Sequence, residues 1–371
     1  MKICHVTSAH KSNDIRIFKK ECVSLAKEEE NEVYLVAAGD SYDKKGVHVI
    51  GVGERKGNRL NRFFSFSRKI YNAAIRIDAD IYHLHDPELL VYVKKFKHRG
   101  KKVIFDSHEY YREQILYKDY IPKLFRIFIS KLYSVYENKI CKWLDAVIFP
   151  CPIEGKHPFE GKVKFYEFIN NTPIIDEKLN YNDENKDYNS VCCAGSLTEN
   201  RGIDILIDAC HKSNTKLILA GEITPEEFKT RIMEKETFSC VDYRGVCSSD
   251  EVIKIYQEAF IGASNILDVG QYSKTENLPT KVYEYMMMGM PFFISDFPYF
   301  REIINRYKCG LLVDPYNIDD IARKIEYLKN NPKEAIKMGK IGKEIVRERF
   351  NWQNEEVKLF ELYNQLYNEV E

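Results

Sequence analysis

The chain has 371 residues, of which 44% are hydrophobic and 30% charged, and its 56 Lys and Arg residues balance its 56 Asp and Glu residues. Because a single core seldom grows past about 250 to 300 residues, this length predicts two domains. No segment carries the run of about 18 uncharged apolar residues that a membrane-spanning helix needs, so we do not expect a transmembrane protein.

The N-terminus and the cysteines both bear on the compartment. The stretch MKICHVTSAH passes directly from one lysine into an alternating apolar pattern, without the apolar region and cleavage site of a signal peptide. The 10 cysteines are scattered over expected strands and helices, and no Cys-x-x-Cys spacing occurs. Both features are typical of a cytoplasmic protein with reduced thiols.

Short apolar runs alternate with longer amphipathic stretches, which predicts parallel sheets covered by helices. The first Rossmann-like unit has the expected strands KICHVTS, EVYLVAA, IYHLH, KVIFDSH and AVIFP. A polar segment rich in Asn and Asp, residues 170–190, is the expected linker. The second unit then follows with SVCCAGS, KLILAG, CVDYRG, IGASNIL, PFFIS and GLLVD. We expect an acceptor-side domain over residues 1–172, a donor-binding domain over 173–352, and a last helix over about 353–371 that packs back on the first.

Charge is distributed unevenly along the chain. Residues 1–170 hold 31 basic and 22 acidic side chains, a net charge of +9, so the remainder carries −9. Residues 55–77 contain seven basic and no acidic side chains, and residues 120–133 add a similar basic and aromatic pattern. This favours contact with an anionic membrane surface, but a basic loop before a core-packed helix, or two domains of opposite charge, would give the same pattern. No nucleic-acid recognition motif accompanies the charge, so we do not expect nucleic acid as a partner.

The stretch TENLPTKVYEYMMMGMPFFIS, residues 275–295, contains an expected helix. This helix should begin near Pro279 or Thr280 and end at Gly289, because proline is tolerated in a first turn and glycine often ends a helix. Its first turn would offer free N–H groups and a partial positive charge, which together with Thr280 and Lys281 suit a phosphate group. An ordinary surface helix would begin in the same way.

Within this stretch, Glu276 and Glu284 form a Glu-x7-Glu pattern followed by MMMGMPFFISDFP, which resembles the donor-site motif of glycosyltransferase family 4. AGSLTENRGIDILIDA, residues 194–209, is similar to the family's strand and loop that end in a basic residue and glycine, here Arg201 and Gly202. IYHLHDPELL and VIFDSHEYY resemble its paired histidine-bearing strand ends. The likeness covers nearly the full chain and implies the α/β GT-B fold, with two Rossmann-like domains facing a central cleft, and a retaining nucleotide-sugar transferase.

The resemblance also implies roles for individual residues. The expected donor-binding residues are Ser196, Arg201, Val246, Thr280, Lys281 and Glu284. Arg201 and Lys281 would neutralise the donor diphosphate as its bond to the sugar breaks, and Glu284 would hold the ribose. Glu276 would accept hydrogen bonds from hydroxyls of the sugar, and His108 would reach both the sugar and the reacting phosphate. The expected catalytic residues are therefore His108, Glu276, Arg201 and Lys281.

The chain departs from the family pattern in two places. The loop after the first strand, SAHKSNDIR, lacks the glycines that many relatives have there, so Asp14 or Arg16 would take over contacts in this region. Ser196 stands where relatives often carry an arginine, which leaves two obvious cations for the diphosphate. The turn at residues 243–246 resembles the one that holds the nucleotide base and does not distinguish uracil from guanine.

No His or Cys cluster with ligand spacing stands out in the sequence, so neither a metal ion nor another cofactor is expected to be required. His83 and His85, alternate residues of one expected strand, should point to the same side and be structural, and His85 with Asp86 could also shape the loop under the acceptor.

The sequence thus predicts a cytoplasmic enzyme, peripheral on the inner face of the membrane. It would move a sugar from a UDP- or GDP-sugar to a glycan or polyprenyl-linked acceptor in the assembly of a surface polysaccharide, such as O-antigen or capsule. Two alternatives remain open. A nucleotide-sugar epimerase of the same fold would convert the free donor without any acceptor, and an inactive nucleotide-sugar-binding subunit would bind the donor without transfer or hydrolysis.

Overall fold

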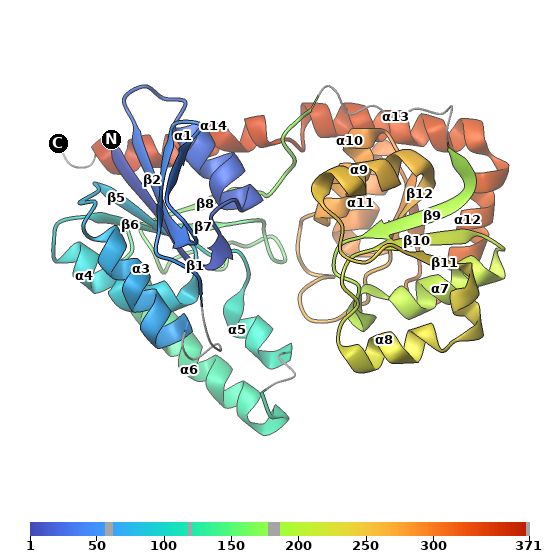
Figure 1. Ribbon diagram of the computed structural model, residues 1–371, viewed down its shortest axis with the longest axis horizontal. Coiled ribbons are helices and arrows are strands. Elements are labelled where there is room, and N and C mark those ends of the chain that lie inside the picture. The colour runs from blue at the N-terminus through green and yellow to red at the C-terminus, as the bar shows by residue number, and fades with distance from the viewer. Residues whose placement is uncertain (56–61, 118–120, 177–185, 369–371) are drawn as a thin grey trace. The chain divides into compact units, whose positions relative to one another are not determined.

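The computed structural model describes residues 1–55, 62–117, 121–176 and 186–368 (Figure 1). The chain forms two compact units: unit 1 contains Met1–Asn171 and Trp352–Glu371, and unit 2 contains Thr172–Asn351. Part of the predicted linker, residues 177–185, and part of the basic stretch, residues 56–61, lie outside the described residues. None of the 10 cysteines, all of which lie in described segments, forms a disulfide.

Unit 1 is built on an eight-stranded sheet in the order β3-β4-β2-β1-β5-β6-β7-β8, in which only the β3–β4 pair is antiparallel. Its strands are β1 (Lys2–Lys11), β2 (Glu32–Ala38), β3 (Tyr42–Lys44), β4 (Val47–Gly51), β5 (Ile81–Leu84), β6 (Lys102–Asp106), β7 (Ala146–Phe149) and β8 (Phe165–Phe168). All five strands predicted for this half are present, and β3, β4 and β8 were not predicted.

Helices cover both faces of this sheet. They are η1 (Ile15–Cys22), α1 (Val23–Leu25), η2 (Arg62–Phe66), α3 (Ser67–Ala74), η3 (Pro87–Tyr92), α4 (Val93–Lys97), α5 (Tyr111–Gln114), η4 (Ile115–Tyr117), α6 (Lys123–Cys141) and α14 (Trp352–Asn368). Residues alternate between the two faces, so Cys4 and Val6 of β1 pack toward α3, α4 and α6, whereas Ile3 packs toward η1, α1 and α14. The last helix therefore completes the core of unit 1.

Unit 2 has a six-stranded, all-parallel sheet in the order β11-β10-β9-β12-β13-β14. The strands are β9 (Asp187–Ala194), β10 (Lys216–Ala220), β11 (Val241–Tyr243), β12 (Ala259–Ser264), β13 (Phe292–Ser295) and β14 (Leu311–Val313), all six of them predicted. The helices are η6 (Glu199–Arg201), α7 (Ile203–Lys212), α8 (Glu226–Met233), η7 (Glu236–Cys240), α9 (Ser249–Glu258), α10 (Thr280–Met288), α11 (Pro298–Tyr307), α12 (Ile318–Asn330) and α13 (Pro332–Glu348).

The strand order of unit 2 places its ligand edge. From β9 the chain moves outward through β10 and β11, then crosses back to β12 and moves outward on the other side. Open sheets of this kind bind ligands beyond the carboxyl ends of the strands, at the point where the order reverses. Here that point lies between β9 and β12. The segments that follow these two strands contain all the predicted donor-binding residues except Val246, which follows β11.

Candidate active site

The helix α10 begins and ends where the sequence predicted. Its N-cap is Pro279, whose side chain has no atom that could accept a hydrogen bond from the N–H groups of the first turn. Gly289 closes the helix in the left-handed conformation with a φ of 74°. Thr280 is exposed in the first turn. The helix start therefore offers the donors and the partial positive charge that an anion requires.

Lys281 connects this helix to the end of β9. Its Nζ donates to the Sγ of buried Cys193 at 3.1 Å, and its Cε lies 3.9 Å from where a Cβ on Gly195 would stand. Ser196 follows this glycine and is exposed. The lysine charge is thus held at the carboxyl end of the central strand, beside the loop that contains Ser196.

Three loops meet at the same edge. Gly195 N–H donates to Ala220 O at 2.8 Å, and Gly221 N–H donates to Gly245 O at 2.6 Å. A Cβ on Gly221, where φ is +140°, would lie 1.8 Å from the carbonyl oxygen of Gly195, so only glycine fits there. Val246 follows this contact and is 79% exposed.

Arg201 is the last residue of η6, which follows β9, and it contacts an aromatic side chain. Its Nη2 donates to the Tyr272 hydroxyl at 3.3 Å, and its guanidinium lies 4.7 Å from the centre of that ring. Gly202, with a φ of 58°, starts α7 directly after it, and Asn265 at the end of β12 donates to the carbonyl of Gly202 at 3.3 Å. The sequence did not indicate Tyr272, which comes from a turn with no motif of its own.

The two glutamates of the Glu-x7-Glu pattern lie in different segments, one in a loop and one in a helix. Glu276 is half-buried in the loop before α10, whereas Glu284 is half-buried within the helix. The hydroxyl of Tyr256, from α9, donates to Glu284 Oε2 at 2.6 Å. Burial and the neighbouring carboxylate raise the pKa of Tyr256 well above its ordinary value, so the phenol keeps its proton and remains a donor. Tyr256 was also not predicted, because nothing in α9 marks it as a partner.

In unit 1, His108 follows β6 and contacts two buried side chains. Its Nε2 lies 3.0 Å from Asp106 Oδ2 and 3.3 Å from His85 Nδ1. Asp106 also accepts two hydrogen bonds from Arg16, at 2.8 and 2.9 Å. Although burial opposes ionisation, the Arg16 guanidinium holds the pKa of Asp106 well below its ordinary value. An ionised, fixed carboxylate thus orients the His108 ring.

The structure assigns other roles to Asp14 and Arg16 than contact with a ligand. Arg16 is buried, and besides its bonds to Asp106 it donates to Ile169 O at 3.0 Å. Asp14 caps η1 by accepting from Ile17 N–H at 3.0 Å, and it lies 3.3 Å from His10. The idea that Arg16 replaces the missing glycines is therefore wrong, because its donors are used inside unit 1.

Asp86, which follows β5, binds the second half of β1. Its Oδ2 accepts from Thr7 Oγ1, Ser8 N and Ala9 N at 2.8, 2.7 and 3.1 Å. His83 and His85 are fully buried on one face of the sheet, with ring centres 4.6 Å apart, as expected for alternate strand residues.

Two groups of side chains among the described residues have the spacing of metal ligands. One consists of His5, Glu21, His83 and His85, and the other of His85, Asp106 and His108. Both lie in unit 1. In unit 2 the ligand edge carries the predicted cations Arg201 and Lys281.

Both units match models of known protein families. Residues 21–157 match the model described as Glycosyltransferase Family 4, and residues 174–345 match the model described as Glycosyl transferases group 1. The O-antigen biosynthesis glycosyltransferase WclY of Escherichia coli is 23% identical over 382 residues, which cover 100% of both chains. The uncharacterized glycosyltransferase MJ1178 of Methanocaldococcus jannaschii is 26% identical over 245 residues, 60% of this chain and 66% of that protein.

Solved structures share the fold over the whole length. Sucrose-phosphate synthase of Thermosynechococcus elongatus gives a TM-score of 0.76 at 16% identity and covers 99% of both chains. HepE of Anabaena, in complex with UDP and glucose, gives 0.70 at 13% identity and covers 98% of this chain and 100% of its own. These structures show the GT-B fold, and the two family models matched above show that the chain belongs to glycosyltransferase family 4.

Proposed function

We propose that the protein transfers a sugar, with retention at the anomeric carbon, from a UDP- or GDP-sugar to a glycan or lipid-linked acceptor in surface polysaccharide assembly. The observation that carries this proposal is the start of α10, where Lys281 meets the end of β9 at the point where the strand order reverses. The full-length likeness to an O-antigen glycosyltransferase supports the pathway, and the UDP in the HepE complex supports a nucleotide donor.

In this proposal each residue of the ligand edge has one task. Lys281, Arg201 and the N–H groups of α10 neutralise the diphosphate as it leaves, which is preorganised charge stabilisation. Glu284, fixed by its bond to Tyr256, accepts from the ribose, and the backbone beside Val246 holds the base.

Thr280 and Ser196 add hydroxyl donors beside the phosphates. Glu276 accepts from the sugar hydroxyls, and His108, oriented by Asp106, contacts the donor sugar. Because the leaving diphosphate is neutralised by side chains and backbone, turnover should not require added Mg²⁺ or Mn²⁺.

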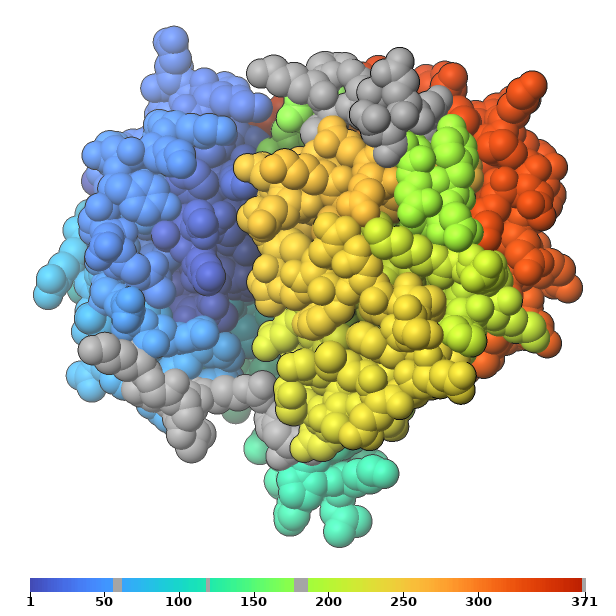
Figure 2. Space-filling model, turned by 45° about the vertical axis from the view of Figure 1, so that its right-hand side comes forward, coloured from blue at the N-terminus to red at the C-terminus, as the bar shows by residue number. Residues whose placement is uncertain are grey.

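We also propose that unit 1 attaches to an anionic membrane surface through α6. Seven large apolar side chains of this helix are exposed, and Figure 2 shows its first turns, in blue-green, standing clear of the surface. They are Leu124, Phe125, Ile127, Phe128, Ile129, Leu132 and Val135. The helix also carries Lys123, Arg126, Lys131 and Lys139, while its one acid, Glu137, is buried.

The positive charge of this helix favours an anionic membrane, rather than a second copy of the chain, as the partner of the apolar surface. A second copy of the same helix would bring like charges together, whereas anionic lipid headgroups complement them. Exposed Phe64 and the exposed cations Arg68 and Lys69, within the predicted basic stretch, provide a further contact. Among the described residues, no helix combines the length and the apolar character needed to span a bilayer.

Vesicle binding tests the attachment. The chain should bind vesicles that contain phosphatidylglycerol more tightly than vesicles of phosphatidylcholine alone, and salt should weaken this binding. The double variant Leu124→Ser and Phe128→Ser should lose it, whereas Val357→Ser, which changes a half-exposed apolar residue on α14, should not. Equal binding by all three proteins would refute the proposal.

A thermal-shift panel of UDP- and GDP-sugars tests the donor assignment. A ligand at 100 times its dissociation constant adds about 2.7 kcal/mol to the free energy of unfolding, so the true donor should raise Tm clearly above the other nucleotides. The selected donor is then incubated with lipid-linked acceptors. If no nucleotide sugar shifts Tm at millimolar concentration, the donor assignment is wrong.

A further inference from the structure

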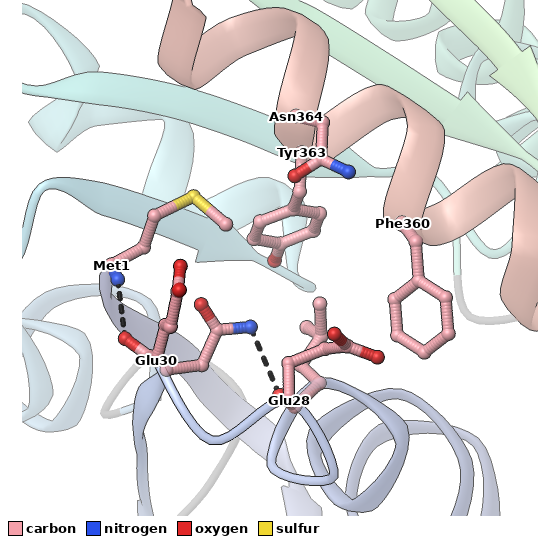
Figure 3. Close-up of a pocket in the computed structure, with 8 residues that line it drawn as sticks. Met1, Glu28, Glu30, Phe360, Tyr363 and Asn364 are labelled. Atoms are coloured by element: carbon pink, nitrogen blue, oxygen red, sulfur yellow. Dashed lines mark hydrogen bonds between the residues drawn. The ribbon is translucent and has the colours of Figure 1, made fainter.

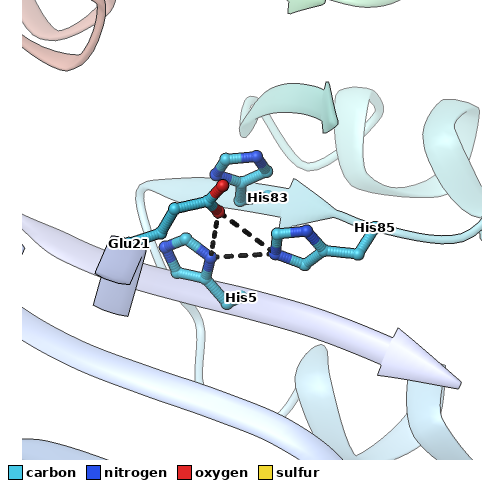
Figure 4. A group of neighbouring side chains, drawn as sticks. All are labelled: His5, Glu21, His83 and His85. Carbon is cyan, nitrogen blue, oxygen red and sulfur yellow. Dashed lines mark hydrogen bonds and ion pairs between the residues drawn. The ribbon is translucent and has the colours of Figure 1, made fainter. Parts of the chain in front are cut away.

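Four titratable side chains meet on the η1 and α14 face of the unit 1 sheet, and they lie in the core rather than at a surface (Figure 4). His5 of β1 pairs in register with His83 of β5, and His85 lies two residues further along the same face. Glu21 reaches them from η1. All four side chains are fully buried. Polar groups are rarely retained in such a place unless something satisfies them.

Three of the four atoms that face one another form a small triangle. Glu21 Oε2 lies 3.8 Å from His5 Nδ1 and 3.8 Å from His85 Nε2, and the two nitrogens are 3.0 Å apart. A point equidistant from these corners lies about 2.1 Å from each, which is the length of a Zn–N or Zn–O bond. His83 belongs to the same group, in which one ligand atom from each residue lies within 4.8 Å of the others, and its Nε2 has no hydrogen-bond partner.

The outward-facing atoms of the same side chains already have partners. The Tyr363 hydroxyl lies 2.8 Å from His83 Nδ1 and 3.3 Å from His5 Nε2, so both nitrogens can donate to its oxygen. His85 Nδ1 lies 3.4 Å from the Asp106 carboxylate. Histidines that bind a metal usually donate their second nitrogen to a carboxylate or another acceptor in this way. Of the remaining nitrogens, His5 Nδ1 and His85 Nε2 lie 3.0 Å from each other, and His83 Nε2 has no hydrogen-bond partner.

The electrostatic balance also favours a cation. Arg16 is bonded twice to Asp106 and lies 3.1 Å from the other carboxylate oxygen of Glu21, so it is shared between two buried acids. Both carboxylate oxygens of Glu21 are buried and have no hydrogen-bond partner. A bound cation would supply the charge that this carboxylate lacks.

We propose that His5, Glu21, His83 and His85 bind one zinc ion, which ties β1, β5 and η1 together beneath the residues that orient His108. Three imidazoles and one carboxylate suit zinc, whereas Mg²⁺ and Ca²⁺ prefer oxygen ligands alone. The ion would be structural and would take no part in sugar transfer, so the proposal is independent of the proposed function.

A pocket lies next to this layer, on the other side of Tyr363. It has a volume of about 290 Å³ and is lined by Met1, Glu28, Glu30, Tyr363 and neighbouring residues of α1 and α14 (Figure 3). The two glutamates are exposed and attract cations. Tyr363 contributes both to the lining of this pocket and to the bonds with His5 and His83, so it separates the pocket from the site.

Metal analysis of the full chain tests the proposal. The protein is purified without a histidine tag or a chelator, and we expect about one zinc ion per chain by elemental mass spectrometry. Protein refolded with Co²⁺ should show the visible absorption of a low-coordinate Co²⁺ site. Glu21→Gln and His83→Gln should lose the metal, and Tyr363→Phe should lower metal affinity by about 10- to 100-fold.

His157→Gln is the matched control, because His157 is a buried histidine of the same unit outside the group. Its metal content should equal that of the unaltered chain. If the ligand variants do not fold, two other measurements test the proposal: the Co²⁺ spectrum of the unaltered chain, and the metal affinity of Tyr363→Phe. The proposal is overturned if the chain retains no zinc and gives no Co²⁺ absorption, or if soluble, folded ligand variants keep the same metal content.

Discussion

Replacing Glu284 by glutamine tests the role of this carboxylate with little change in shape. The Tyr256 hydroxyl donates to Glu284 Oε2 at 2.6 Å, and an amide oxygen can accept the same bond, so the packing of α10 against α9 should survive. What is lost is the negative charge offered to the ribose. A hydrogen bond to a charged group contributes about 1.5 to 3 kcal/mol and a neutral one about 0.5 to 1.5 kcal/mol. The affinity for free UDP or GDP should therefore fall by roughly 5- to 12-fold.

Calorimetry with the free nucleotide, paired with rates of transfer or donor hydrolysis, separates this role from that of Glu276. The ribose is present in donor and product alike, so Glu284→Gln should weaken nucleotide binding and turnover together. Glu276→Gln should reduce turnover far more than affinity for the sugar-free nucleotide, because sugar hydroxyls occur only in the donor. Glu302→Gln, an exposed position on α11, is the control and should change neither. Unchanged nucleotide affinity in Glu284→Gln would refute the ribose assignment, and full turnover in Glu276→Gln would remove that residue from the sugar site.

Three further predictions concern charge, backbone and pH. Lys281→Met and Arg201→Met should each lower the affinity for free UDP or GDP by roughly 10- to 150-fold, which is the range for one charge-assisted contact. Unchanged affinity in both variants would contradict the diphosphate site. Gly221→Ala should lower the free energy of unfolding by more than about 2 kcal/mol because its Cβ would meet a carbonyl at 1.8 Å, whereas Gly100→Ala, with a φ of +74° but nothing within 4 Å, should cost only about 1 kcal/mol. Burial lowers the pKa of His157 from 6.5 to about 4, so the folded state disfavours protonation and stability falls as pH drops between these values. His157→Gln should remove roughly 1 to 3 kcal/mol of that fall, since solvent screening reduces the full value, and identical pH profiles for both proteins would show that His157 does not titrate in this way.

The sequence predicted the central strands of both units because these strands are buried on both faces and read as continuous apolar runs. It missed β3, β4 and β8, which lie toward the edges of the unit 1 sheet and mix buried with exposed positions. Such strands take much of their stability from pairing with neighbours, and local composition does not record that pairing.

The same distinction applies to the sites. Lys281, Glu284 and the bounds of α10 were predictable because one continuous stretch carries them and a proline and a glycine mark its ends. Tyr256 and Tyr272, which hold Glu284 and Arg201, come from other elements and have no motif. The group of His5, Glu21, His83 and His85 has no ligand spacing in the sequence, since the pairing of β1 with β5 and the return of η1 over the sheet bring three segments together.

The central claim is that the protein is a retaining transferase that acts on a nucleotide sugar. Nuclear magnetic resonance spectra of the selected nucleotide sugar, recorded while it is incubated with the full chain, test this claim most directly. Without an acceptor, a water molecule should slowly take the place of the acceptor and hydrolyse the donor. The account then predicts free nucleoside diphosphate and free sugar, and the first anomer of the sugar to be detected should have the configuration of the donor. With a lipid-linked acceptor, the new glycosidic linkage should have that same configuration. Free sugar that first appears as the opposite anomer would contradict retention. Signals of a second nucleotide sugar would instead identify an epimerase, and binding with neither hydrolysis nor transfer would identify an inactive subunit, so either result would contradict the account.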